Sequence, residues 1–135
     1  MKYIAVIGSR YWDDYNTFLN KINYYTKDIK DDITFVSGGA ESGADALVEK
    51  FCKEHDMPII IYPAKWTDIE GKKPYEIGTR KDGTPYYKLA GFDRNINIIA
   101  KSDFVIAFWN GRSRGTEHGI GLAKGTKKPY RIVKI

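Results

Sequence analysis

The chain has 135 residues, of which 42% are hydrophobic and 29% charged, as expected for a single folded domain rather than a disordered segment. No run of about 18 apolar residues is present, so we expect a cytoplasmic protein without a membrane partner. The single cysteine excludes an internal disulfide. One cysteine and two histidines far apart in sequence are too few ligands for a metal site, and we expect no cofactor. The net charge of +5 favours an anionic partner. Because the basic residues are dispersed, a phosphorylated small molecule is favoured over nucleic acid.

Apolar runs and helical spacings alternate through the N-terminal part of the chain. Runs rich in Ile and Val predict buried strands, and Asp13 and Asp14 precede a helical spacing of apolar residues, which predicts a capped helix. The expected elements are a strand at Lys2–Ile7, a helix at Tyr15–Lys27, a strand at Ile33–Ser37, a helix at Ser42–Asp56 and a strand at Pro58–Tyr62.

The segment Ala64–Leu89 differs in character, because it is rich in Lys, Gly, Pro and Tyr and has no helical period. Near its centre, Lys81-Asp82-Gly83 contains the Asp-Gly pair that is typical of a hairpin turn. We therefore predict a hairpin-like flap inserted near residues 66–89, which either shapes the ligand pocket or contributes to an oligomer contact.

Alternation resumes after the flap. The expected elements are a helix at Ala90–Ser102, a strand at Asp103–Trp109, a loop at Asn110–Thr116, a helix at Glu117–Lys124 closed by Gly125, and a strand at Tyr130–Ile135. This alternation predicts an α/β fold, a Rossmann-like three-layer sandwich with a mostly parallel sheet of about five strands over residues 1–135. Right-handed crossovers favour the strand order 3-2-1-4-5, which opens a ligand crevice at the carboxyl ends of the first and fourth strands.

Two glycine-bearing loops follow the first two strands. Gly8-Ser9-Arg10 combines a sharp turn with a hydroxyl and a planar cation suited to phosphate, the alternative being an ordinary turn with a solvated arginine. The second loop runs from Ser37-Gly38-Gly39 to Asp45, and its consecutive glycines let a ligand approach the backbone amides beside a helix N-terminus. Asp45 either accepts a hydrogen bond from a ribose hydroxyl or is an acid favoured by the helix dipole.

A third loop, Trp109 to Thr116, combines two glycines, Gly111 and Gly115, with hydroxyl groups that include Ser113 and with two arginines. Its position before a helix predicts an anion cradle, although it lacks the Gly-Lys-Ser/Thr of a P-loop. Trp109, at a strand end, is the best candidate for stacking on a base.

Arg94 and Asn95 are predicted at the start of the helix after the flap, where the helix dipole disfavours an arginine. This placement indicates a ligand contact, the alternative being an ion pair with Asp93 or Asp103. Glu117 is the acid–base candidate beside the third loop, although a first helical turn also favours an acid through the dipole alone. If the chain is an enzyme, Arg94 and Glu117 are its candidate catalytic residues.

Taken together, these motifs resemble the SLOG superfamily, and within it the small single-domain branch described as YspA-type or cpYpsA-related, found in bacteria and phages. The resemblance covers most of the chain outside the flap. The residues that carry it are Gly8-Ser9-Arg10 with Trp12 and Asp13, Val36 to Ala40, Gly43-Ala44-Asp45, Pro63-Ala64 with Trp66, Gly91, Arg94-Asn95 and Ala107 to Thr116.

The resemblance implies a Rossmannoid fold that binds nucleotides or their derivatives and often self-associates, so we expect a homo-oligomer. It also implies that ligand phosphate lies near Gly38, Gly39, Gly115 and Thr116, with Ser9 and Arg10 alongside. Relatives include phosphoribohydrolases, whose motif has a glutamate three residues after its threonine. Here Gly119 stands at that position, which is a departure from the motif.

Three hypotheses follow. The leading one is a sensor or sequestering protein that binds a phosphate-bearing nucleotide or nucleotide-derived ligand through the glycine-rich loops. The first alternative is a nucleotide N-glycosidase, and the second is single-stranded DNA binding of the kind implied by the DprA relatives.

Overall fold

The computed structural model describes all residues, 1–135, and its main feature is a five-stranded sheet in which every neighbouring pair is parallel. The strands are β1 (Lys2–Gly8), β2 (Ile33–Ser37), β3 (Ile59–Ile61), β6 (Phe104–Trp109) and β7 (Tyr130–Lys134). Their order, β3-β2-β1-β6-β7, confirms the predicted order 3-2-1-4-5.

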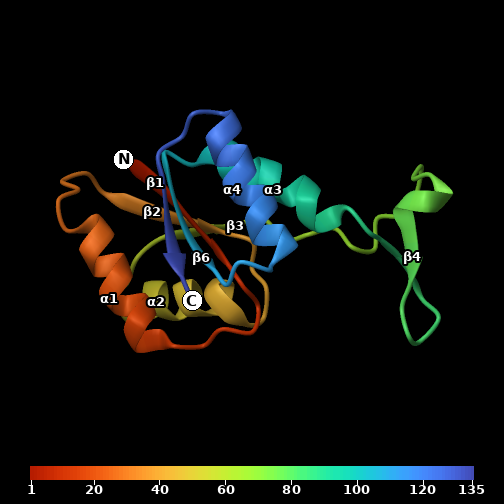
Figure 1. Cartoon of the computed structure of the whole chain (residues 1–135), viewed down its shortest axis with the longest axis horizontal. Helices are drawn as coiled ribbons and strands as arrows, with labels where there is room; N and C mark the ends of the chain where they lie inside the picture. Colours follow the sequence, from red (N-terminus) through yellow and green to blue (C-terminus); the bar gives the residue numbers. More distant parts are fainter.

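Two pairs of helices cover the two faces of this sheet (Figure 1). On one face lie α1 (Tyr15–Thr26) and α2 (Gly43–Glu54), and on the other lie α3 (Ala90–Lys101) and α4 (Arg114–Gly125). Each face has its own apolar core. Phe18 and Phe51 belong to the cluster under α1 and α2, whereas Ile98 and Ile120 belong to the cluster under α3 and α4. The three-layer Rossmann-like sandwich is thereby confirmed.

The register of β1 brings two of the predicted loops to one edge of the sheet. Gly8, the last residue of β1, lies opposite Phe108 near the end of β6. A Cβ on Gly8 would come within 2.6 Å of the Ala44 Cβ and 2.8 Å of the Phe108 carbonyl oxygen. Only glycine therefore lets β1, β6 and the start of α2 converge at this point.

Both ends of α4 differ from the sequence prediction. α4 begins at Arg114 rather than Glu117, because the Ser113 side chain caps the helix and accepts a hydrogen bond from the Thr116 amide. α4 also continues through Gly125, and the left-handed residue beyond it is Lys127, with φ +58°. The prediction that Gly125 closes the helix was therefore wrong.

The segment between β3 and α3 forms the predicted flap. It contains a short 3₁₀ helix (Pro74–Glu76) and an antiparallel hairpin of β4 (Ile77–Thr79) and β5 (Pro85–Tyr87). Gly83 turns the hairpin with φ +87°, and the hairpin stands well away from the sheet and its helices (Figure 1). None of the helices has both the length and the apolar composition needed to cross a lipid bilayer.

Candidate functional site

A cavity of about 420 Å³ opens where the carboxyl ends of β1, β2 and β6 meet. Its size is within the range of small-molecule sites. The first, second and third glycine loops, the start of α3 and the base of the flap all contribute to its wall. The cavity wall contains ten of the residues predicted to bind ligand: Gly8, Ser9, Arg10, Gly38, Asp45, Arg94, Asn95, Ser113, Gly115 and Thr116.

The first loop is held against the N-terminus of α2. The Ser9 carbonyl oxygen accepts a hydrogen bond from the Ala44 amide at 3.3 Å, and the Ser9 amide donates to the Phe108 carbonyl at 3.1 Å. Gly43 makes this contact possible, because it has φ +71° and a Cβ there would overlap the Ser9 carbonyl oxygen. The backbone of Ser9 is thus fixed on both sides.

The side chain of Ser9 is not satisfied in the same way. The residue is only 3% exposed, it lies in the cavity wall, and its Oγ has no hydrogen-bond partner. A buried hydroxyl without a partner carries a desolvation cost, and such groups are rare in folded proteins. This oxygen is therefore available to a group that enters the cavity.

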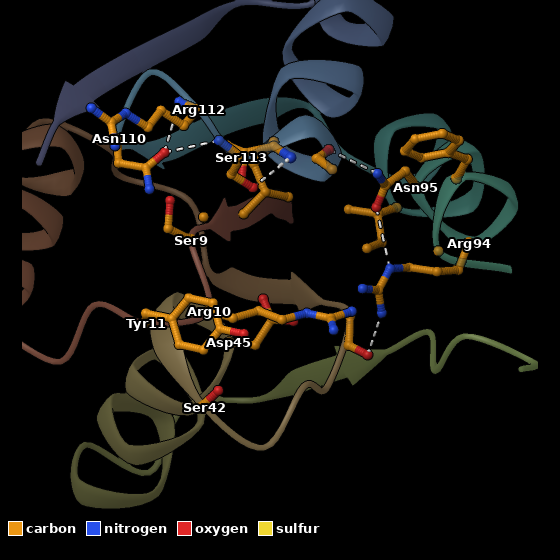
Figure 2. A pocket seen from close by; sticks show the side chains of 18 of the residues that line it. Ser9, Arg10, Tyr11, Ser42, Asp45, Arg94, Asn95, Asn110, Arg112 and Ser113 are labelled. Atoms are coloured by element: carbon orange, nitrogen blue, oxygen red, sulfur yellow. Dashed lines mark hydrogen bonds between the residues drawn. The ribbon is translucent and has the colours of Figure 1, made fainter. Parts of the chain in front are cut away.

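The third loop is built by a side chain that sequence analysis did not assign. Asn110 Oδ1 accepts hydrogen bonds from the amides of Arg112 at 2.8 Å and Ser113 at 2.9 Å. This turn places Ser113 at the N-cap position of α4. The first turn of α4, with Gly115 and Thr116, then lines the cavity (Figure 2). Amides in the first turn have no partner within the helix, which makes this end a site for anions.

Arg94 approaches the second loop from α3. Its Nη1 donates to the Gly38 carbonyl oxygen at 2.8 Å, and its Nε donates to Asn95 Oδ1 at 3.2 Å. A Cβ on Gly38 would overlap the Arg94 guanidinium, so a larger residue there would displace this side chain from its present position. Arg94 lies one turn inside α3, which begins at Ala90, so the prediction that it starts the helix was wrong.

The alternative ion pair of Arg94 with Asp93 or Asp103 is not seen, and both carboxylates have other partners. Asp93 accepts a hydrogen bond from the Tyr87 hydroxyl at 2.7 Å, and Asp103 accepts one from the Tyr3 amide at 2.8 Å. Arg94 is instead turned toward the cavity (Figure 2).

Asn95 links α3 to α4 beside Arg94. Its Nδ2 donates to the Gly115 carbonyl oxygen at 3.1 Å and lies 3.3 Å from His118 Nδ1. Burial lowers the pKa of His118, which favours a neutral ring that accepts through Nδ1. Asn95 thereby fixes the distance between Arg94 and the N-terminus of α4.

Three charged side chains converge on the α2 side of the cavity. Arg10 and Arg94 reach toward one another from the first loop and α3, with Asp45 beside them (Figure 2). Asp45 is 8% exposed, and its Oδ2 accepts a hydrogen bond from the Ala40 amide at 3.1 Å. Burial raises the pKa of Asp45, opposed by this hydrogen bond and by the charge of Arg94. Burial also lowers the pKa of Arg94, and the nearby charge of Arg10 lowers it further.

Five predicted residues lie outside the cavity wall. Ser37 and Gly39 support the second loop, since the Gly39 amide donates to Ser37 Oγ at 3.3 Å. Gly111 turns the third loop with φ +81°. Trp109 packs against the core under α3 and α4, and its Nε1 donates to the Ser113 carbonyl at 3.1 Å. Glu117 is exposed on α4.

Other residues of the wall were not among the predicted site residues. They are Ile7, Tyr11, Ser42, Trp66, Lys88, Gly91, Phe92, Ile98, Asn110 and Arg112. An asparagine directly after a strand is a known signal for a turn closed by its side chain, so Asn110 was detectable. Trp66 and Lys88 come from the two ends of the flap, and Phe92 comes from the first turn of α3 that follows it. A sequence period does not reveal where an insertion returns to its domain.

The side chains of the wall are predominantly cationic. Four side chains carry a positive charge, those of Arg10, Lys88, Arg94 and Arg112, and Asp45 is the one acidic side chain among the lining residues. No group of three or more His, Cys, Asp or Glu side chains converges to hold a metal ion. The structure therefore brings cations, helix N-termini and a free hydroxyl together in one cavity.

Comparison with protein families matches residues 3–68 to the model of the YspA, cpYpsA-related SLOG family. The matched region runs from β1 to just beyond β3 and includes the first two cavity loops. No curated protein matches the chain.

Three solved structures share the fold. The molybdenum cofactor binding protein from the phototrophic bacterium Rippkaea orientalis has a TM-score of 0.65 at 18% identity, over 99% of this chain and 77% of its own. DNA processing protein A from Helicobacter pylori, described as binding single-stranded DNA, has 0.59 at 22%, over 97% of this chain and 64% of its own. The Moco carrier protein from Chlamydomonas reinhardtii has 0.57 at 17%, over 98% and 75%.

Proposed function

We propose that this chain, which belongs to the YspA, cpYpsA-related SLOG family, binds a phosphate-bearing nucleotide or nucleotide-derived ligand. The ligand occupies the cavity at the carboxyl edge of the sheet, and the protein acts as a sensor or a sequestering protein for it. The fold neighbours include proteins described as binding the molybdenum cofactor and single-stranded DNA. Because their sequence identities to this chain are below 25%, these neighbours do not indicate which ligand the chain binds.

The observation that carries the proposal is the free hydroxyl of Ser9. It is buried in the cavity wall without a partner, and the first turn of α4 lines the same cavity. A phosphate oxygen at this place would accept hydrogen bonds from the hydroxyl and from the first-turn amides, and the helix dipole would favour its charge. A neutral ligand would leave the cations of the wall without a counter-charge.

The rest of the wall suits the non-phosphate part of a nucleotide. Trp66, Phe92, Ile7 and Ile98 supply aromatic and apolar surface, on which a base can stack or pack. Trp66 takes the role that the sequence suggested for Trp109. Glycosidic hydrolysis is less well supported, because Glu117, the acid–base candidate, is exposed and outside the wall.

The first experiment is to purify the protein without added ligand, denature it, and identify released small molecules by mass spectrometry. A nucleotide or another phosphate-bearing compound would support the proposal and give the ligand class. If nothing is released, calorimetric titration with AMP and adenosine compares ligands that differ only in the phosphate.

We expect AMP to bind and adenosine to bind at least about tenfold more weakly, the loss expected for removal of a charge-assisted contact. Arg131→Gln serves as a control, since Arg131 is exposed on β7 and outside the cavity wall. Equal affinity for the two ligands, or no binding of any phosphate-bearing nucleotide, would refute the proposal.

A further inference from the structure

The cavity wall carries more positive charge than one phosphate group neutralises. Four bases and one acid line it, and a phosphate monoester carries a charge of about −1.5 to −2 at neutral pH. Across the whole chain, 22 bases face 17 acids. Removing the four bases and one acid of the wall leaves an excess of only two bases elsewhere. The cavity wall therefore has a net charge of +3, and a second basic cluster, formed by Lys124, Lys127, Lys128 and Arg131, lies away from it.

Three of the four cations, those labelled in Figure 2, come from two parts of the wall, and Lys88, at the base of the flap, belongs to neither group. The first group, which we term the α4 subsite, consists of the Ser9 hydroxyl, the first turn of α4 at Gly115 and Thr116, and Arg112. The second, which we term the arginine subsite, consists of Arg10 and Arg94 beside Gly38. Asn95 connects them, because it bonds both Arg94 and the Gly115 carbonyl.

The arginine subsite has only a partial counter-charge of its own. Asp45 is the single carboxylate of the wall near the two guanidiniums, and it is already bonded to the Ala40 amide. Arg94 is held in place by the Gly38 carbonyl rather than by an acid. Two cations held close together are destabilising unless an anion joins them, and a planar guanidinium is well suited to a phosphate.

On these grounds we propose that the ligand carries two anionic groups, one at the α4 subsite and one at the arginine subsite. The ligand class is a nucleotide with two phosphates, either adjacent, as in a nucleoside diphosphate, or on different positions of the ribose. This inference rests on the proposed function and specifies the ligand of that same site.

Calorimetric titration of the full chain tests it with AMP, ADP and adenosine 3′,5′-bisphosphate. We expect at least one of the two-phosphate ligands to bind about tenfold or more tightly than AMP, the gain of one further charge-assisted contact. In Arg10→Gln this gain should fall below about threefold, because the two-phosphate ligands lose more affinity than AMP does. In Ser9→Ala all three ligands should weaken by a similar factor.

The controls separate the inference from the proposed function. Arg131→Gln removes a cation outside the cavity and should retain the full gain, and thermal unfolding should verify that each variant is folded. If AMP binds as tightly as both two-phosphate ligands, or if Arg10→Gln retains the gain, the two-subsite inference is overturned and the proposed function stands. If neither AMP nor the two-phosphate ligands bind, both are overturned.

Discussion

Ser9 is the residue at which stability and function are expected to have opposite requirements. Its buried hydroxyl has no partner in the protein, so removing it should relieve a desolvation cost. We predict that Ser9→Ala raises the free energy of unfolding of the ligand-free protein by up to about 1 kcal/mol and weakens nucleotide binding about tenfold. Chemical denaturation and calorimetric titration measure the two effects.

Ser102→Ala is the matched control for this change. Ser102 is 1% exposed, but its Oγ donates to the Ile98 carbonyl at 2.7 Å. Losing a satisfied buried hydrogen bond should lower the free energy of unfolding by about 1 kcal/mol and leave nucleotide affinity unchanged. A Ser9→Ala variant as destabilised as Ser102→Ala would show that the Ser9 hydroxyl is already bonded in the free protein.

Asp45 gives a prediction about pH. Burial raises its pKa above the ordinary value of 3.8, so the folded state binds a proton more tightly than the unfolded state. Stability contributed by this group therefore falls as pH rises from about 3.8 through the raised pKa. In Asp45→Asn this fall should disappear, so the stability of the variant relative to the natural protein should increase over that range. Denaturation at a series of pH values measures it, and a constant difference would contradict it.

At the scale of single residues, sequence reasoning identified the cavity residues whose positions follow from the ends of the strands. Gly8, Ser9, Gly38 and Ser113 lie at strand ends or in the loops that follow them, and strand ends are predictable from composition. Trp109 lies outside the cavity wall for a tertiary reason, because the third loop folds back and the indole bonds the Ser113 carbonyl within it.

At the scale of elements, the contact between the first loop and α2 depends on Gly43. Its φ is +71°, and a Cβ would overlap the Ser9 carbonyl oxygen and Arg10. We predict that Gly43→Ala costs about 2 kcal/mol or more in free energy of unfolding, through backbone strain and displacement of the loop, and that it also weakens nucleotide binding.

Gly121→Ala is the comparison for this variant. Gly121 lies inside α4, and a Cβ there would meet no atom within 4 Å. Alanine should therefore stabilise the helix by about 0.5–1 kcal/mol. Denaturant unfolding measures the free energy of unfolding of both variants. Equal changes in the two variants would contradict the requirement for glycine at position 43.

The flap hairpin should be separable from the binding cavity. Gly78 pairs with Tyr86 in the hairpin, so residues 79–85 can be replaced by Asn-Gly, which closes a two-residue hairpin turn. Because the hairpin stands away from the domain (Figure 1), we predict a melting temperature within about 3 °C of the natural protein and unchanged nucleotide affinity.

Light scattering of the same two proteins tests the self-association expected from the family resemblance. A lower mass in the shortened protein would assign the oligomer contact to the flap tip, and an equal mass would assign it elsewhere. Loss of nucleotide binding without loss of folding would contradict the separation of flap and cavity.

Element boundaries were less predictable than element types. The start of α4 was placed three residues late, because a sequence period gives no weight to Gly115 and Thr116, which the Ser113 cap brings into the helix. The flap was recognised from its Asp-Gly turn, yet its projection from the domain depends on contacts such as Tyr87 with Asp93. A few neighbouring residues determine the type of a turn, whereas the direction in which an insertion projects depends on tertiary contacts.

At the scale of the whole molecule, the order of the strands was predictable because few right-handed arrangements exist for this alternation. That order brings the three glycine loops to one edge of the sheet, and it therefore predicts the place of the site as well as the fold. It does not predict the Arg10 and Arg94 pair, since the closeness of two side chains from separate elements depends on packing.

The positive charge of the cavity wall leads to a prediction about salt that distinguishes a small ligand from single-stranded DNA. A cavity of about 420 Å³ admits few phosphates, and each neutralised phosphate on a single strand contributes a slope of about −0.7 in a plot of log affinity against log salt. We therefore expect a slope no steeper than about −2 for a two-phosphate nucleotide, and no tighter binding of a 20-residue oligothymidylate than of AMP. Calorimetric titrations from 50 to 500 mM KCl measure both. An oligonucleotide that binds more tightly than AMP, with a slope several times steeper, would mean that the protein contacts a polyanion along its surface, because such a slope requires more phosphate contacts than the cavity holds.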